Sequence, residues 1–238
     1  EAKRLWAAVD RPNAMIKIPG TLAGLPAITE CIAAGINVNI TLLFSVARYQ
    51  AVIEAYLAGL EQRIAKGQPI DAIASVASFF VSRVDGRVDG LLDDLAKGSP
   101  LRGKIAIANA ALAYQAFQTI LASPRWKALE AKGATRQRPL WASTSTKDPQ
   151  YPDVYYVEAL VAADTVNTLP PDTFAAYRDH GQPAVRIGEA IQTAGRWATM
   201  LAAAGIGMTE VTAFLEKDGV TKFAASYQSL VRGIESKM

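Results

Sequence analysis

The sequence predicts an α/β fold in which parallel strands, joined by helices, form an incomplete (β/α) barrel. Short apolar runs alternate with longer helical patterns up to Pro170. The runs are almost continuously hydrophobic, as is typical of strands that are buried on both faces. Single helical segments between them indicate parallel pairing. Only five runs are present, where a complete barrel of this kind has eight strands.

The elements follow one another in a regular order. Thr21 is expected to cap a first helix that stops at Gly35, and Ser45 to cap a longer one that stops at Gly67. Between these caps and stops, apolar residues recur with helical spacing. The predicted strands cover 14–18, 36–44, 73–81, 138–143 and 164–169.

A helical tail follows the last strand. Pro170 and Pro171 open it, and we expect it to end in two helices between Met208 and Ser236. No low-complexity segment or long linker divides the chain, which predicts a single domain over 1–238. A doubly wound open sheet is the alternative to a barrel. No glycine-rich phosphate fingerprint follows any strand, and this favours the barrel.

Composition argues against several classes of function. The net charge is +3 and the basic residues are scattered, so no nucleic-acid-binding stripe is expected. The sequence contains neither a long apolar run nor a signal-peptide pattern, which predicts a cytoplasmic protein without a membrane partner. Cys31 is expected to be a buried, inert thiol. No His, Cys or carboxylate spacing suggests a metal, and neither metal nor organic cofactor is expected.

Polar residues near the C-terminal ends of the strands mark the expected site, because barrel enzymes carry their catalytic groups there. Lys17 is the most informative. An ammonium group within a buried strand is costly, whereas a desolvated lysine loses its proton more readily and then forms an imine with a ketone. The alternative is a lysine that extends from the strand end into solvent. The candidates are Lys17, Asn39, Thr41, Ser75, Ser78, Arg83 and residues 143–147.

Two further groups of residues suggest a phosphorylated ligand. Asn39 and Thr41 lie two apart on one strand and therefore face the same side. They either contact a substrate or form a buried hydrogen-bonded pair that supports the fold. Arg83 and Lys147 each follow a strand, and both cations suit a phosphate, which hydroxyl groups of 143–146 would help to bind. The alternative is that both are solvated surface charges.

Six segments together resemble transaldolases, in the longer bacterial form of that family. The resemblance covers essentially the whole chain. It implies a TIM-type (β/α)8 barrel that transfers a dihydroxyacetone unit from sedoheptulose 7-phosphate or fructose 6-phosphate to an aldose phosphate, in the pentose phosphate pathway and without a cofactor. The segments, in chain order, are RPNAMIKIPGT, GINVNITLLFS, VASFFVSRVD, WASTSTKDP, ALVAADTVNTLPPDT and AAAGIGMTEVTAFLEKDGVTKFAASY.

The resemblance also implies roles for single residues. Lys17 matches the Schiff-base lysine of the family. Asn39 and Thr41 match the pair that holds the substrate hydroxyls and positions a catalytic water. Ser78 and Arg83 match residues that line the substrate and bind its phosphate. The catalytic residues implied are therefore Lys17 and Thr41.

The sequence also departs from the family pattern. Ser143 matches a phosphate-site serine, but shorter family members carry an arginine shortly after it, where this chain has STSTK. Either Lys147 or Ser145 is expected to replace that arginine. The family's acid/base partners, an aspartate on an early strand and a glutamate on the third, are expected upstream of Glu1, together with the first three strands. An N-terminal segment or a second chain would then complete the barrel.

Two alternatives to a transaldolase stay open. A related Schiff-base aldolase, which releases free dihydroxyacetone from fructose 6-phosphate, would use the same lysine. The 238 residues alone would instead be catalytically silent if they lack the acid/base carboxylates. In that case two unpaired sheet edges would favour association with another chain.

Overall fold

The protein is built around one sheet of five parallel strands. A computed structural model describes residues 1–95 and 98–237. The strands follow in the order β1-β2-β3-β4-β5, so each pairs with its neighbours in the chain. A doubly wound sheet reverses its strand order, whereas a barrel does not, and the observed order is that of part of a barrel. The strands are β1 (Ile16–Pro19), β2 (Val38–Leu43), β3 (Ser75–Phe80), β4 (Arg138–Ala142) and β5 (Val166–Asn167).

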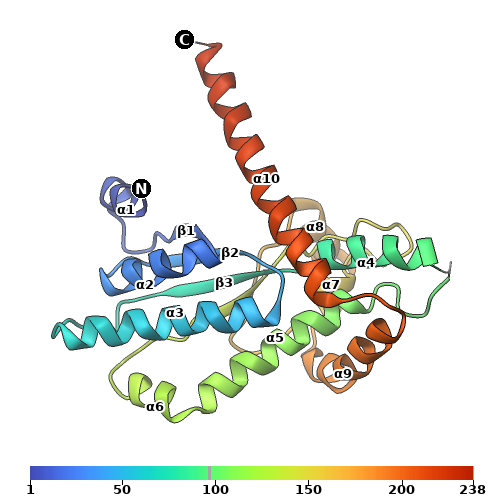
Figure 1. Cartoon of the computed structure of the whole chain (residues 1–238), viewed down its shortest axis with the longest axis horizontal. Helices are drawn as coiled ribbons and strands as arrows, with labels where there is room; N and C mark the ends of the chain where they lie inside the picture. The colour runs from blue at the N-terminus through green and yellow to red at the C-terminus, as the bar shows by residue number, and fades with distance from the viewer. Residues whose placement is uncertain (96–97, 238) are drawn as a thin grey trace.

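The α/β class and all five predicted strands are confirmed. Thr21 and Ser45 accept hydrogen bonds from backbone N–H groups three residues on, as predicted for N-caps. Helices α2 and α3 lie side by side against the sheet, and α5 packs on α3 and α9 (Figure 1). The helices are α1 (Ala2–Val9), η1 (Leu22–Gly24), α2 (Leu25–Ala33), α3 (Val46–Ala65), α4 (Ser82–Leu95), α5 (Ile105–Ala122), α6 (Pro124–Glu130), α7 (Tyr155–Ala159), α8 (Pro171–His180), α9 (Ile187–Ala203) and α10 (Met208–Glu235).

The two faces of the first strand differ in burial. Ile16 and Ile18 are buried in the hydrophobic core, whereas Lys17 and Pro19 are exposed. β1 is an edge strand, paired with β2 alone. Lys17 therefore lies on the open face of β1, opposite the face that packs into the core.

Strand β2 ends in a bulge. Its register with β3 shifts between Ile40 and Leu43, and Leu42 has a φ of 61°. A positive φ is uncommon for a residue with a branched side chain, and bulges of this kind redirect side chains next to active sites. Leu42 packs against α10, where a Cβ added at Gly219 would lie 2.9 Å from Leu42 Cδ2.

The helical tail differs from its prediction. Two helices were expected between Met208 and Ser236, but α10 runs unbroken for 28 residues. The prediction was wrong because the helix continues through Gly219, which provides room for Leu42 at a close contact. Asp218 and Lys222 form an i,i+4 ion pair across this position, with an N–O distance of 2.6 Å. Figure 1 shows α10 extending away from the sheet, with the C-terminus at its tip.

Among the described residues, α5 is long and apolar enough to cross a membrane by length and composition, and the bent α9–α10 pair passes the same test together. However, 61% of the α5 segment is buried within the protein. It packs against α3, α4 and α9. Its environment is therefore that of a core helix.

Candidate active site

Three neighbouring strands bring Lys17, Asn39 and Ser78 together. Lys17 pairs in register with Asn39, so both side chains leave the same face of the sheet. The Ser78 hydroxyl donates to Asn39 Oδ1 over 2.7 Å. Ser78 is buried and Asn39 is half-buried. Because Oδ1 accepts from Ser78, the amide of Asn39 is oriented with its donors free for a ligand, and no described residue accepts from them.

Thr41 lies two residues beyond Asn39, within the bulge of β2. Its backbone oxygen accepts from Gly20 N over 2.8 Å. Its side chain is buried, and within 1–95 and 98–237 its Oγ1 has no hydrogen-bond partner. Leaving a buried hydroxyl unpaired costs free energy, and such a group requires an explanation. A ligand or an ordered water at this position would satisfy it.

Lys17 is exposed, which differs from the desolvated lysine expected from the apolar run. β1 is an edge strand paired with β2 alone, so Lys17 has strand neighbours on one side only. No acidic side chain in the described part of the chain pairs with its amine. The exposure of Lys17 agrees with the alternative of a lysine that extends into solvent. Lys17 nevertheless lies in register beside Asn39 on β2.

Ser143 follows β4 in a strained conformation. Its φ is 57°, in the left-handed region that residues with a Cβ rarely adopt. Ser82, the first residue of α4, stabilises it twice. The Ser82 N–H donates to Ser143 O over 2.9 Å, and the two hydroxyl oxygens lie 3.0 Å apart. Strain supported in this way is typical of functional positions.

Asn167 on β5 is a further candidate that sequence reasoning missed. Thr144, fully buried, donates its hydroxyl to Asn167 Oδ1 over 2.8 Å. The available signal was a polar residue within an apolar strand, the pattern that singled out Asn39. Strand β5 was recognised, but its asparagine was not.

The two candidate phosphate cations lie in different surroundings. The Arg83 guanidinium carbon is 5.0 Å from the centre of the Phe80 ring, a cation–π contact that orients it. Lys147 is exposed, and its Nζ donates to Ser145 Oγ over 2.9 Å. No contact among the described residues joins Arg83 to Lys147. The convergence expected of them therefore stays a prediction.

A second group of polar residues was not identified from sequence. Asp85 and Asp89 on α4 are buried, and each accepts a hydrogen bond from a tyrosine hydroxyl, Tyr156 for the first and Tyr151 for the second. Burial raises the pKa of Asp85 to about 7. Burial also raises the pKa of Asp89. The signal was the regular spacing of aspartates along one helix, but their tyrosine partners lie 71 and 62 residues away in the chain.

Cys31 is buried, as predicted. It lies in α2, and burial raises the pKa of its thiol, which makes it less reactive. His180 is exposed at the end of α8, where it contacts Asp153 and Asp179. In the described part of the chain, no group of three or more His, Cys, Asp or Glu residues is arranged to hold a metal.

Comparison with known proteins adds an independent line of evidence. A family model described as "Transaldolase/Fructose-6-phosphate aldolase" matches residues 1–234. The chain is 52% identical over its whole length to "Transaldolase" of Saccharopolyspora erythraea, of which it covers 65%. "Transaldolase" of Frankia alni is also 52% identical, with the same two coverages. "Transaldolase 2" of a Nostoc species is 48% identical, again over all of this chain and 66% of that protein. The chain thus spans about two-thirds of the length of these relatives.

Proposed function

Because the chain belongs to the transaldolase/fructose-6-phosphate aldolase family, we propose that it carries the nucleophile and much of the substrate site of a transaldolase. Lys17 forms a Schiff base with a ketose phosphate, sedoheptulose 7-phosphate or fructose 6-phosphate. A dihydroxyacetone unit is then transferred to an aldose phosphate. The reaction belongs to the pentose phosphate pathway in the cytoplasm and uses no cofactor.

The observation that carries this proposal is the unpartnered Thr41 hydroxyl. It is buried on the strand that presents Asn39, whose in-register neighbour is Lys17. A hydroxyl there can hold the water that is lost and regained when an imine forms and hydrolyses. The Asn39 amide donors can bind hydroxyl groups of the same substrate. A purely structural role does not explain why a buried threonine hydroxyl stands here without a hydrogen-bond partner among the described residues.

The proposed reaction proceeds in balanced steps. The neutral Lys17 amine adds to the ketose carbonyl carbon. The hydroxyl group of the resulting carbinolamine accepts a proton from an acid and leaves as water, which gives a protonated imine. The imine accepts the electron pair of the C3–C4 bond as that bond breaks, after the C4 hydroxyl has lost its proton to a base. The aldose product leaves, and the enamine that remains attacks the carbonyl of the acceptor aldose, whose oxygen gains a proton. Water then releases the new ketose and restores the amine.

The phosphate of the substrate is assigned to residues beyond the strand ends. Arg83, oriented on Phe80, supplies a guanidinium group, and Ser143 supplies a hydroxyl held beside Ser82. Ser78 lines the site, where its hydroxyl donates a hydrogen bond to Asn39 and so orients the Asn39 amide toward the substrate. Lys147, bonded to Ser145, provides the positive charge that the family's arginine supplies in shorter members.

We further propose that a segment or second chain covers the open face of β1. It would carry the family's aspartate and glutamate, which accept and donate the protons in these steps. Two observations support this: Lys17 lies exposed on an edge strand, and relatives exceed the chain in length. Covering that face would also desolvate Lys17, which favours its neutral form.

Reductive trapping tests the proposed function. The chain is treated with fructose 6-phosphate and borohydride, both alone and joined to the natural N-terminal segment of a full-length relative. We expect the fused protein to gain the mass of a reduced adduct on Lys17. Labelling of another lysine, or no labelling in the fused protein, would refute the role. Analysis of the products with and without erythrose 4-phosphate then distinguishes transfer of the dihydroxyacetone unit from its release as free dihydroxyacetone. If the chain without the N-terminal segment shows no turnover, it is catalytically silent by itself.

Replacing Thr41 by valine is expected to separate catalysis from stability. Valine keeps the shape but removes a hydroxyl that no described residue satisfies, so the free energy of unfolding should stay equal or rise by about 1 kcal/mol. Turnover of the fused protein should fall roughly 100-fold, the lower range for losing proton-transfer assistance. Urea denaturation and steady-state kinetics measure the two quantities. A loss of stability with unchanged turnover would show a structural role.

A further inference from the structure

Helix α4 presents a row of polar side chains along one face. Ser82, Asp85, Asp89 and Asp93 follow one another at spacings of three and four residues, which places them one above the other on a helix. The row faces the β4–α7 loop, which we define as residues 143–154. A cavity of about 400 Å3 lies between them, lined by α4 residues on one side and by Lys147, Asp148, Pro149 and Tyr151 of the loop on the other. The proposed phosphate-binding residues Ser143 and Lys147 both belong to this loop.

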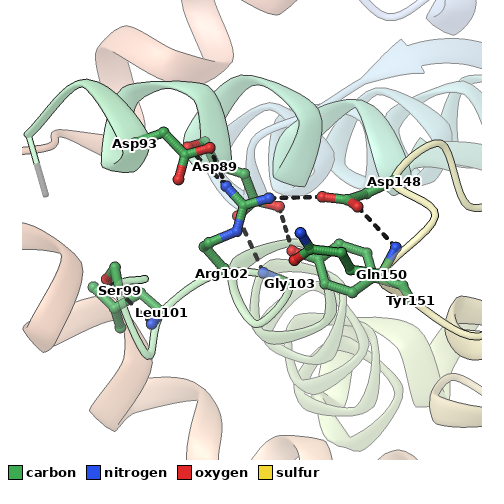
Figure 2. Close-up of polar contacts among 9 residues, drawn as sticks. All are labelled: Asp89, Asp93, Ser99, Leu101, Arg102, Gly103, Asp148, Gln150 and Tyr151. Carbon is green, nitrogen blue, oxygen red and sulfur yellow. Dashed lines mark hydrogen bonds and ion pairs between the residues drawn. The ribbon is translucent and has the colours of Figure 1, made fainter. Parts of the chain in front are cut away.

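The far end of the loop is fixed to Asp89. Its Oδ2 accepts from the Tyr151 hydroxyl over 2.7 Å, and its Oδ1 accepts from Gly103 N over 3.1 Å (Figure 2). The Tyr151 ring also lies close to Gly103, where an added Cβ would approach the ring to 2.8 Å. Burial, and then the bond to Asp89, raise the pKa of Tyr151, so its hydroxyl remains a donor. Asp89 therefore holds the loop and the turn before α5 together.

An arginine reinforces this contact. The Arg102 guanidinium bridges Asp93 on α4 and Asp148 in the loop, with an Nη2–Oδ2 distance of 2.6 Å to Asp148 (Figure 2). Asp148 Oδ1 in turn accepts from the backbone N–H of Gln150 over 2.9 Å. The loop thus meets α4 directly through Tyr151 and indirectly through Arg102.

The near end of the loop is fixed to the same helix. Ser82 bonds Ser143 through both its backbone and its hydroxyl group. Because one rigid helix anchors both ends, the position of Tyr151 against Asp89 restricts the path of the residues between. Ser143 depends on this restriction, since its left-handed backbone is unfavourable when it is not held.

We propose that Asp89, Tyr151 and Arg102 are positioning residues, which hold the β4–α7 loop against α4 so that Ser143 and Lys147 can bind the phosphate of the substrate. The proposal rests on the proposed function for the identity of the ligand. The residues act through the loop and do not themselves contact the sugar. Their loss should therefore weaken phosphate binding and leave the chemistry at Lys17 unchanged.

The test compares Tyr151→Phe with the matched control Tyr155→Phe. Tyr155 stacks on Tyr151, and its hydroxyl donates to Gly103 O over 2.8 Å, but it makes no hydrogen bond to an α4 carboxylate. Each substitution removes one hydroxyl from the same aromatic group. Inorganic phosphate is the probe for binding, measured by calorimetry, and amide hydrogen exchange reports on residues 143–150.

In Tyr151→Phe we expect the Kd for phosphate to rise about tenfold, the equivalent of one lost hydrogen bond to a charged group, and exchange in 143–150 to accelerate. Tyr155→Phe should change neither. In the fused protein, Tyr151→Phe should raise KM for fructose 6-phosphate with little change in kcat. Three results would each overturn the proposal. The two variants could have equal effects, amide exchange in Tyr151→Phe could be unaltered, or the wild-type chain could bind no phosphate. If Lys17 resists trapping while Tyr151→Phe still weakens phosphate binding, the proposed function fails but the role of the loop stands.

Discussion

Substituting arginine for Lys17 is expected to abolish the borohydride-trapped adduct with fructose 6-phosphate. A guanidinium group is always protonated and cannot add to a carbonyl, although it keeps the positive charge. Intact-mass analysis followed by peptide mapping measures the adduct. Because Lys17 is exposed and forms no ion pair with a described residue, the free energy of unfolding should change by less than about 0.5 kcal/mol.

The matched control for this substitution is Lys66→Arg. Lys66 is also exposed, but it lies at the end of α3, away from the strand ends that carry the site. The control should form the adduct to the same extent as the unmodified protein. An adduct that persists in Lys17→Arg would place the nucleophile elsewhere and refute the assignment, whatever the family of the chain.

Replacing Asp85 by asparagine is expected to flatten the pH dependence of stability. The carboxylate is 1% exposed and accepts from Ala106 N over 2.7 Å and from the Tyr156 hydroxyl over 2.9 Å. Burial dominates these bonds and raises its pKa from 3.8 to about 7. The folded state thus holds a proton that the unfolded state has lost, so stability falls as pH rises from about 4 to about 7 and then levels off.

The size of this effect follows from the two pKa values. The difference between 3.8 and about 7 corresponds to roughly 4 kcal/mol, which the wild-type protein loses over that pH interval. Asparagine has no proton to lose, so urea denaturation of Asp85→Asn at pH 5 and pH 8 should show a much smaller difference. Asp94→Asn, at an exposed position of the same helix, is the control and should keep the wild-type slope. An unchanged slope in Asp85→Asn would show that Asp85 ionises normally.

The strands could be predicted because their sequences report burial directly. A run such as NVNITLLF is apolar on both faces, and its polar exceptions lie where the strand approaches the site. The contact between Asn39 and Ser78 follows from the same reasoning, since parallel strands bring their C-terminal ends to one edge. Strand β5 is shorter than predicted because Asp164 adopts a positive φ and Pro170 ends extended pairing soon after.

Other features depend on segments that the local pattern does not contain. The exposure of Lys17 depends on which segments lie beside β1, and the sequence AMIKI does not indicate which strands will pair with it. The continuity of α10 through Gly219 depends on Leu42, which is far away in the chain. The environment of Asp85 likewise depends on Tyr156, which is far away in the chain, so the pattern of α4 alone does not predict that this aspartate is buried. Periodicity describes an element, whereas such contacts arise only between elements.

The close approach of α10 to the β2 bulge has a practical consequence for engineering. A dye, affinity tag or fusion partner attached at the C-terminal end of that helix, which extends away from the sheet, should be tolerated. Substitutions of Gly219 are expected to be poorly tolerated. Any larger side chain would clash with Leu42 and so displace the backbone of the β2 bulge, which orients Thr41. Directed-evolution libraries aimed at the acceptor sugar would therefore do well to spare that single position while varying its outward neighbours.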